Sequence, residues 1–142
     1  MANIEHIQYI KAPASAVYQV LASAEGLAEV WTQELQFVAA IGSVNEFRFG
    51  NEKPTKMEII KLVPDQRMEW SCVDSDPEWI GTCVSFELSE KDGITSVVLQ
   101  HTGWREVTEF YRFCNYNWAI FLLSLKECCE GREGIYYQAR KF

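Results

Sequence analysis

Alternation of apolar and polar side chains over half of the chain constrains its fold more than any other feature. Between residues 33 and 102 apolar side chains recur at every second position, as with Met68, Trp70 and Cys72. A period of two is that of a β-strand with one buried face. Polar segments rich in Gly, Pro, Asn and Asp separate the runs, which is typical of antiparallel hairpins. The expected sheet therefore has one apolar face that another element must cover.

The alternation divides residues 33–102 into several strands, and it predicts one more strand before them in the chain. Strands are expected at residues 4–11, 35–41, 44–49, 55–63, 67–73, 79–88 and 94–102. Two short helices are expected after the first strand, at residues 14–22 and 27–31. Pro13 is placed where the first turn of a helix tolerates proline, and Ser23 can cap the second helix.

The cover for the sheet is expected from residues 107–130, where apolar side chains recur at helical spacing. These are Phe110, Cys114, Trp118, Phe121, Leu125 and Cys128. We therefore predict an α+β fold, in which a curved antiparallel sheet of about six to seven strands wraps around a long C-terminal helix. A length of 142 residues fits one such domain over residues 1–142.

Three segments carry a resemblance to a known family. They are EIIKLVPDQRMEW at residues 58–70, TGW at 102–104 and NWAIFLLSLKECCEG at 117–131. Together with the order of elements they resemble the START-like helix-grip superfamily, in the branch related to the activator of the Hsp90 ATPase. The chain departs from the family pattern at Asn117, where many members have Gly, and at Gly42-Ser43, where Gly-Gly is frequent.

The resemblance implies a cavity between the helix and the sheet that holds a small hydrophobic molecule. It also implies two alternatives, because a few members of the superfamily bind the chaperone Hsp90 and a minority are cyclases or dehydratases. No catalytic residue belongs to the matching segments, so the resemblance favours binding over catalysis.

His101 is the first candidate for a binding residue. By strand alternation it shares a face with Val97 and Leu99, and a neutral imidazole there could orient a ligand through one hydrogen bond. The alternative is a histidine whose hydrogen bonds are made within the protein. The other candidates are expected on the inner face or at the pocket mouth: Trp70, Phe49, Phe86, Leu99, Trp104, Tyr111, Cys114, Trp118 and Phe121. Residue by residue, core packing is the favoured explanation for the inner-face residues.

Charge and motifs exclude several classes of function. The net charge of −7, from 20 acidic and 13 basic residues, disfavours nucleic acid and anionic membranes as partners. The basic pair Arg140-Lys141 is expected to be a solvated end. His6 and His101 stand far apart without ligand spacing, so no metal and no other cofactor is predicted. Phosphate-binding, dinucleotide-binding and nucleophile-elbow motifs are absent from the sequence.

The cysteines and the N-terminal residues indicate a reducing compartment. Five cysteines, an odd number without a CxxC pair, are expected to be free, inert thiols. The N-terminal residues form no continuous apolar run, and residues 118–123 are too few to span a bilayer. We therefore expect a cytoplasmic protein without stable membrane insertion.

Three functions follow, in descending order. The first is a carrier or sensor of a small hydrophobic molecule. The second is an interaction module for a chaperone or another protein, with a homodimer possible through an exposed edge strand. The third is a cyclase-like enzyme, which needs at least two polar side chains converging in the cavity, and only His101 is a fair candidate.

Overall fold

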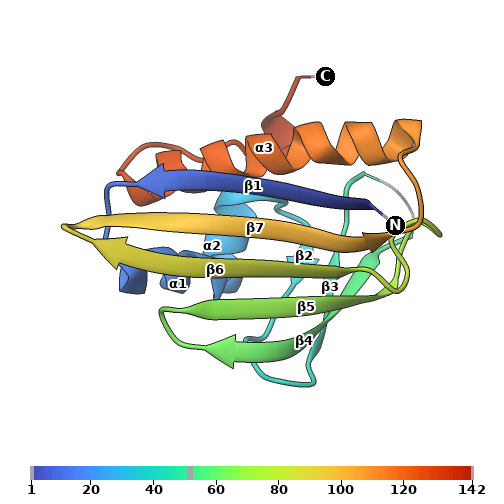
Figure 1. Ribbon diagram of the computed structural model, residues 1–142, viewed down its shortest axis with the longest axis horizontal. Helices are drawn as coiled ribbons and strands as arrows, with labels where there is room; N and C mark the ends of the chain where they lie inside the picture. Colours follow the sequence, from blue (N-terminus) through green and yellow to red (C-terminus); the bar gives the residue numbers. More distant parts are fainter. Residues whose placement is uncertain (1, 51–52, 142) are drawn as a thin grey trace.

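The computed structural model of the protein describes residues 2–50 and 53–141. Seven antiparallel strands form one sheet in the order β1-β7-β6-β5-β4-β3-β2 (Figure 1). The strands are β1 (Ala2–Ile10), β2 (Leu35–Gln36), β3 (Val44–Phe47), β4 (Thr55–Val63), β5 (Arg67–Asp74), β6 (Cys83–Lys91) and β7 (Ile94–Trp104). The helices are α1 (Ala14–Leu21), α2 (Ala24–Val30), α3 (Glu109–Cys129) and the 3-10 turn η1 (Tyr137–Ala139). This confirms the predicted α+β helix-grip fold.

Helix α3 lies alongside the edge strand β1 (Figure 1). It begins after Thr108, whose hydroxyl accepts a hydrogen bond from the Tyr111 backbone N–H and so caps the first turn. Side chains of α3 also bond to β1, because the Tyr111 hydroxyl donates to Asn3 O at 2.6 Å and Lys126 Nζ donates to Tyr9 O at 2.8 Å. The edge of β1 therefore offers fewer free carbonyls to another strand.

Helices α1 and α2 meet at a close contact that only glycine allows. A Cβ on Gly26 would lie 2.1 Å from Val20 O, which is far inside van der Waals contact. The contact brings α2 close to α1, and Trp31, directly after the last residue of α2, lies in the core. The Trp31 ring centroid lies 4.5 Å from that of Phe47 and 5.4 Å from that of Trp118. A sheet residue and an α3 residue are thus joined through Trp31.

The core between the sheet and α3 is largely aromatic. Trp70 on β5 contacts Phe47 and Phe86, with ring centroids 5.7 and 5.1 Å apart. Phe86 in turn contacts Phe121 of α3 at 5.7 Å. These four side chains are fully buried. Burial of large rings supplies much of the hydrophobic stabilisation of a domain, because each ring removes 150–250 Å² from water.

Strand β2 is shorter than expected, with two residues instead of residues 35–41. The side chain of Asn45 takes the place of a neighbouring strand beyond it. Its Oδ1 accepts from the Val38 N–H at 2.8 Å and its Nδ2 donates to Val38 O at 3.3 Å. The backbone of Val38 is therefore satisfied without continuing the sheet.

Strand β6 begins at Cys83, four residues later than expected. Residues 76–82 form consecutive turns instead, since Trp79 N–H donates to Asp76 O at 2.8 Å and Thr82 N–H donates to Trp79 O at 2.9 Å. Gly81, with φ of +88°, allows the chain to leave the turns and enter β6. The turns bring the Trp79 side chain into a buried position, only 8% exposed.

Candidate functional site

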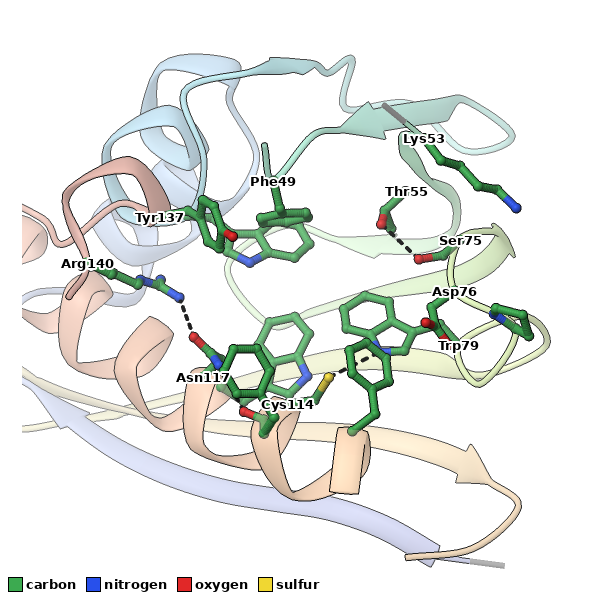
Figure 2. A pocket seen from close by; sticks show the side chains of 15 residues that line it. Phe49, Lys53, Thr55, Ser75, Asp76, Trp79, Cys114, Asn117, Tyr137 and Arg140 are labelled. Atoms are coloured by element: carbon green, nitrogen blue, oxygen red, sulfur yellow. Dashed lines mark hydrogen bonds between the residues drawn. The ribbon is translucent and has the colours of Figure 1, made fainter. Parts of the chain in front are cut away.

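A pocket of about 420 Å³ opens between the first half of α3, the turns after β5, and the segment that follows α3 (Figure 2). Its volume is within the range of small-molecule sites. Its lining residues are Trp31, Phe49, Lys53, Thr55, Ser75, Asp76, Pro77, Trp79, Phe110, Phe113, Cys114, Asn117, Trp118, Tyr137 and Arg140.

Seven of the fifteen residues that line the pocket are aromatic. Trp31 lies 5.1 Å from Phe49 and 5.4 Å from Trp118 between ring centroids, and Trp118 stacks on Trp79 at 6.0 Å. These rings belong to the end of α2, the segment after β3, the turns before β6 and α3. Phe113 lines the pocket and is 48% exposed, so it marks the mouth.

Polar groups occupy two opposite ends of the pocket, as Figure 2 shows. Thr55 and Ser75 are at one end, with their hydroxyls hydrogen-bonded to each other at 2.8 Å. Lys53 lies near them and pairs with Asp74 outside the pocket, with Nζ 2.9 Å from Oδ1. Arg140 is at the other end.

The segment after α3 folds back over α2 and forms one wall of the pocket. Tyr137 N–H donates to Trp31 O at 2.7 Å, and Gly134 N–H donates to Glu29 Oε1 at 2.9 Å. A Cβ on Gly134 would lie 2.4 Å from Glu29 O, so glycine is needed for this close approach. The expectation that Arg140 and Lys141 are a solvated end is wrong for Arg140, which lines the pocket, whereas Lys141 is exposed.

Arg140 is held by three hydrogen bonds to neutral acceptors. Its Nε donates to Ile135 O at 2.9 Å, its Nη1 to Asn117 Oδ1 at 3.4 Å and its Nη2 to Val30 O at 3.3 Å. Asn117 Nδ2 donates to Phe113 O at 2.9 Å, which fixes the amide with its oxygen toward the guanidinium. Burial lowers the pKa of Arg140 to about 10, so the side chain stays cationic at neutral pH.

His101 is fully buried and both of its ring nitrogens are hydrogen-bonded. Trp118 Nε1, which can only donate, lies 3.0 Å from Nδ1, so Nδ1 is the acceptor and the proton of the neutral ring is on Nε2. Nε2 therefore donates to Thr82 Oγ1 at 2.7 Å, and that hydroxyl donates to Trp79 O at 2.6 Å. Burial lowers the pKa of His101 to about 3. A neutral imidazole with both nitrogens engaged has no free lone pair with which to abstract a proton.

The same network continues to a cysteine in the pocket wall. Trp79 Nε1 donates to Cys114 Sγ at 3.4 Å, so the network links Cys114 and Trp118, one helical turn apart on α3. Burial raises the pKa of the Cys114 thiol to about 12. All five cysteines are free, and burial also raises the pKa of Cys72 and Cys129, to about 11 and 12. These are protonated thiols without nucleophilic character at neutral pH.

The structure brings three of the candidate residues together in the pocket, namely Phe49, Cys114 and Trp118. Six others are buried in the core and do not line it: His101, Trp70, Phe86, Leu99, Trp104 and Phe121. Tyr111 packs on Trp104, with ring centroids 5.2 Å apart. Ligand contact by all ten candidate residues stays a prediction.

Several lining residues were missed by reasoning from the sequence. Phe113 lies on α3 three residues after Phe110, another lining residue, so helical spacing could have identified it. Trp79 and Arg140 could not be found in this way, because turns and a returning segment place them.

Within residues 2–50 and 53–141, no three His, Cys, Asp or Glu side chains are grouped to hold a metal ion. The helices of this part of the chain are all too short or too polar to cross a membrane.

A sheet that grips a long C-terminal helix, with a pocket beside that helix, defines a START-like helix-grip protein. Residues 11–130 match the family described as Activator of Hsp90 ATPase homolog 1-like protein, and the chain belongs to this family. No curated protein matches the chain at a significant level.

Solved structures show the same relationship. The Aha1 dimer from Colwellia psychrerythraea is 37% identical, covers 92% of this chain and 98% of its own, and superposes with a TM-score of 0.85. Protein MLL2253 from Mesorhizobium loti is 18% identical over 88% of this chain and 94% of its own, with a TM-score of 0.77. Protein BH1534 from Bacillus halodurans is 19% identical over 89% and 98%, with a TM-score of 0.72. The last two share the fold.

Proposed function

We propose that the protein binds one small hydrophobic molecule in the pocket beside α3, as a carrier or sensor. The observation that carries this proposal is an aromatic-walled pocket of about 420 Å³ in a domain whose core is otherwise filled with large rings. Aromatic walls with a few polar groups at the ends are the usual composition of a small-molecule site. The free, protonated thiols and the fully engaged His101 favour binding over catalysis.

A neutral fluorescent probe, N-phenylnaphthylamine, tests the proposal. We expect the wild-type protein to bind one molecule with an increase in fluorescence, and Cys114→Trp to abolish binding by filling the pocket. Ala119→Trp is the matched control, because Ala119 is exposed on the same helix and does not line the pocket. Native mass spectrometry of gently purified protein would show whether a molecule co-purifies. A wild-type protein that neither binds the probe nor carries a molecule contradicts the proposal.

Protein binding is the second candidate function, and the family favours it. The family description names an activator of the Hsp90 ATPase, and the Colwellia relative is described as a dimer. In this chain Val38 and Ile41 are 63% and 67% exposed, next to the short strand β2. Sedimentation velocity tests homodimer formation, and stimulation of Hsp90 ATP hydrolysis tests the chaperone role. A monomer at all concentrations that leaves Hsp90 activity unchanged would remove this candidate.

A further inference from the structure

Among the described residues that line the pocket, Arg140 is the cation without an ionic partner. Lys53 pairs with Asp74, and Asp76 Oδ1 accepts a hydrogen bond from the Glu78 N–H at 2.9 Å. Arg140 forms no ion pair with a carboxylate of residues 2–50 and 53–141. A guanidinium withdrawn from water is costly unless an anion or several acceptors compensate it.

The acceptors around Arg140 do not use all of its N–H donors. The guanidinium has five N–H donors, and it makes three hydrogen bonds within the described residues. The two from Nη1 and Nη2 are 3.4 and 3.3 Å long, beyond the usual range for N–H···O bonds. The terminal nitrogens therefore retain donors at the pocket end where Asn117 lies (Figure 2).

The planar fork of an arginine matches a carboxylate, sulfonate or phosphate, which it binds through two parallel hydrogen bonds. The chain has a net charge of −7, so an anion gains nothing from the overall charge of the protein. A local cation with unused donors is thus the feature of this pocket that selects an anion.

We propose that the pocket takes an apolar, ring-containing molecule that carries one anionic group. The anionic group is bound by Arg140 beside Asn117, and the apolar body lies against the rings of Phe49, Trp31 and Trp118. This assignment rests on the proposed function, because it names the class of the molecule that the same pocket binds.

A purely structural role for Arg140 is the competing explanation. Its Nη2 donates to Val30 O, the last carbonyl of α2, and its Nε donates to Ile135 O in the returning segment. Cations are favourable at the C-terminus of a helix. A structural role predicts equal effects on charged and neutral ligands, and an anion-binding role predicts unequal effects.

Two probes that differ by one anionic group separate these roles. Anilinonaphthalene sulfonate is N-phenylnaphthylamine with a sulfonate added, and both fluoresce in an apolar site. We expect wild-type protein to bind the sulfonate about 10- to 100-fold more tightly, the range typical of hydrogen bonds to a charged group. Arg140→Gln should abolish this preference and leave the neutral amine within about twofold of wild type. Arg140→Lys should retain part of the preference. Lys141→Gln, which removes a neighbouring exposed charge, should leave both affinities unchanged.

The outcomes distinguish this inference from the proposed function. If the wild-type protein binds neither probe, the proposed function fails. If it binds the neutral amine and shows no preference for the sulfonate, or if Arg140→Gln weakens both probes equally, only the anion assignment is overturned. If Arg140→Gln does not fold, displacement of the neutral amine from wild-type protein decides, because decanoate should displace it at a lower concentration than decanol. Equal displacement by acid and alcohol would overturn the assignment.

Discussion

Trp118 contributes to two regions of the molecule that differ in how completely their polar groups are hydrogen-bonded. Its indole N–H donates to His101 in the closed region between α3 and β7, and its ring lines the pocket that contains Arg140. His101 is fully buried, and every nitrogen of its ring is hydrogen-bonded. Arg140 keeps two long hydrogen bonds and unused donors. A polar group whose bonds are all made within the protein holds the fold, and one with bonds left to make can hold a ligand.

The comparison predicts that substitution of Trp118, the residue common to both regions, has the largest effect on the free energy of unfolding. Trp118→Ala should lower the free energy of unfolding by about 3–5 kcal/mol, because it empties a buried site and leaves His101 Nδ1 without its donor. Phe113→Ala on the same helix removes a ring that is 48% exposed at the pocket mouth, and should cost less than about 1 kcal/mol. Urea unfolding of both variants measures the difference. Equal losses would mean that the pocket side is packed as tightly as the closed side.

Removal of the Thr82 hydroxyl should have the next largest effect on the free energy of unfolding. Thr82→Val keeps the shape of the side chain, but leaves the Nε2 proton of His101 unpaired, whereas the carbonyl of Trp79 still accepts the backbone N–H of residue 82. One buried donor without a partner should lower the free energy of unfolding by about 1–3 kcal/mol. Thr82→Ser, which retains the hydroxyl, should cost less than about 1 kcal/mol. Similar losses for the two variants would show that His101 does not depend on this hydroxyl.

The fold could be predicted from the sequence because its signals are local and repeat along the chain. Apolar side chains at a period of two, followed by a long run at helical spacing, define a sheet and its covering helix. Where the predicted strand bounds were wrong, local hydrogen bonds that alternation does not predict were the reason. The side chain of Asn45 ended β2, and the turns around Gly81 delayed β6.

The candidate site was harder to predict because its walls come from segments distant in the sequence. His101 was a candidate because it is an isolated histidine on an apolar face. Strand alternation does not predict that its two ring nitrogens are hydrogen-bonded to Thr82 and Trp118. Arg140 was expected to be a solvated end, and only the return of the chain at Gly134 brings it to the pocket. Asn117, noted as a departure from the family pattern, is the residue that accepts from Arg140 Nη1.

Acidification should have a smaller effect on stability, specific to the closed region around His101. Because burial lowers the pKa of His101 to about 3, the native ring stays neutral while the unfolded chain takes up a proton below about pH 6.5. The unfolded state then binds more protons, so stability is fully present above pH 6.5 and falls as the pH decreases toward 3, by at most about 1.4 kcal/mol per pH unit. The groups packed on the ring are Trp79, Thr82, Trp104 and Trp118, none of which is charged.

Urea unfolding between pH 6.5 and about pH 5 isolates this contribution, because carboxyl groups take up protons mainly at lower pH. His101→Gln should flatten the slope in this window, although the variant is less stable at every pH. An unchanged slope in the variant would show that another group titrates, and that the closed region does not hold a neutral histidine.

The smallest effect on stability is expected at Arg140, and this sharpens the comparison. Arg140→Gln removes three hydrogen bonds to neutral acceptors, two of them longer than 3.2 Å, so it should lower the free energy of unfolding by no more than about 1 kcal/mol. Lys141→Gln should stay within about 0.5 kcal/mol of wild type. Thr82→Val should show the converse behaviour, with a larger loss of stability and an unchanged preference between charged and neutral probes. If Arg140→Gln lowers the free energy of unfolding by about 3 kcal/mol or more, the loss is that of a broken buried network. Arg140 would then be a structural partner of α2. In that case the polar groups of both regions would stabilise the fold, and the comparison between the regions would fail.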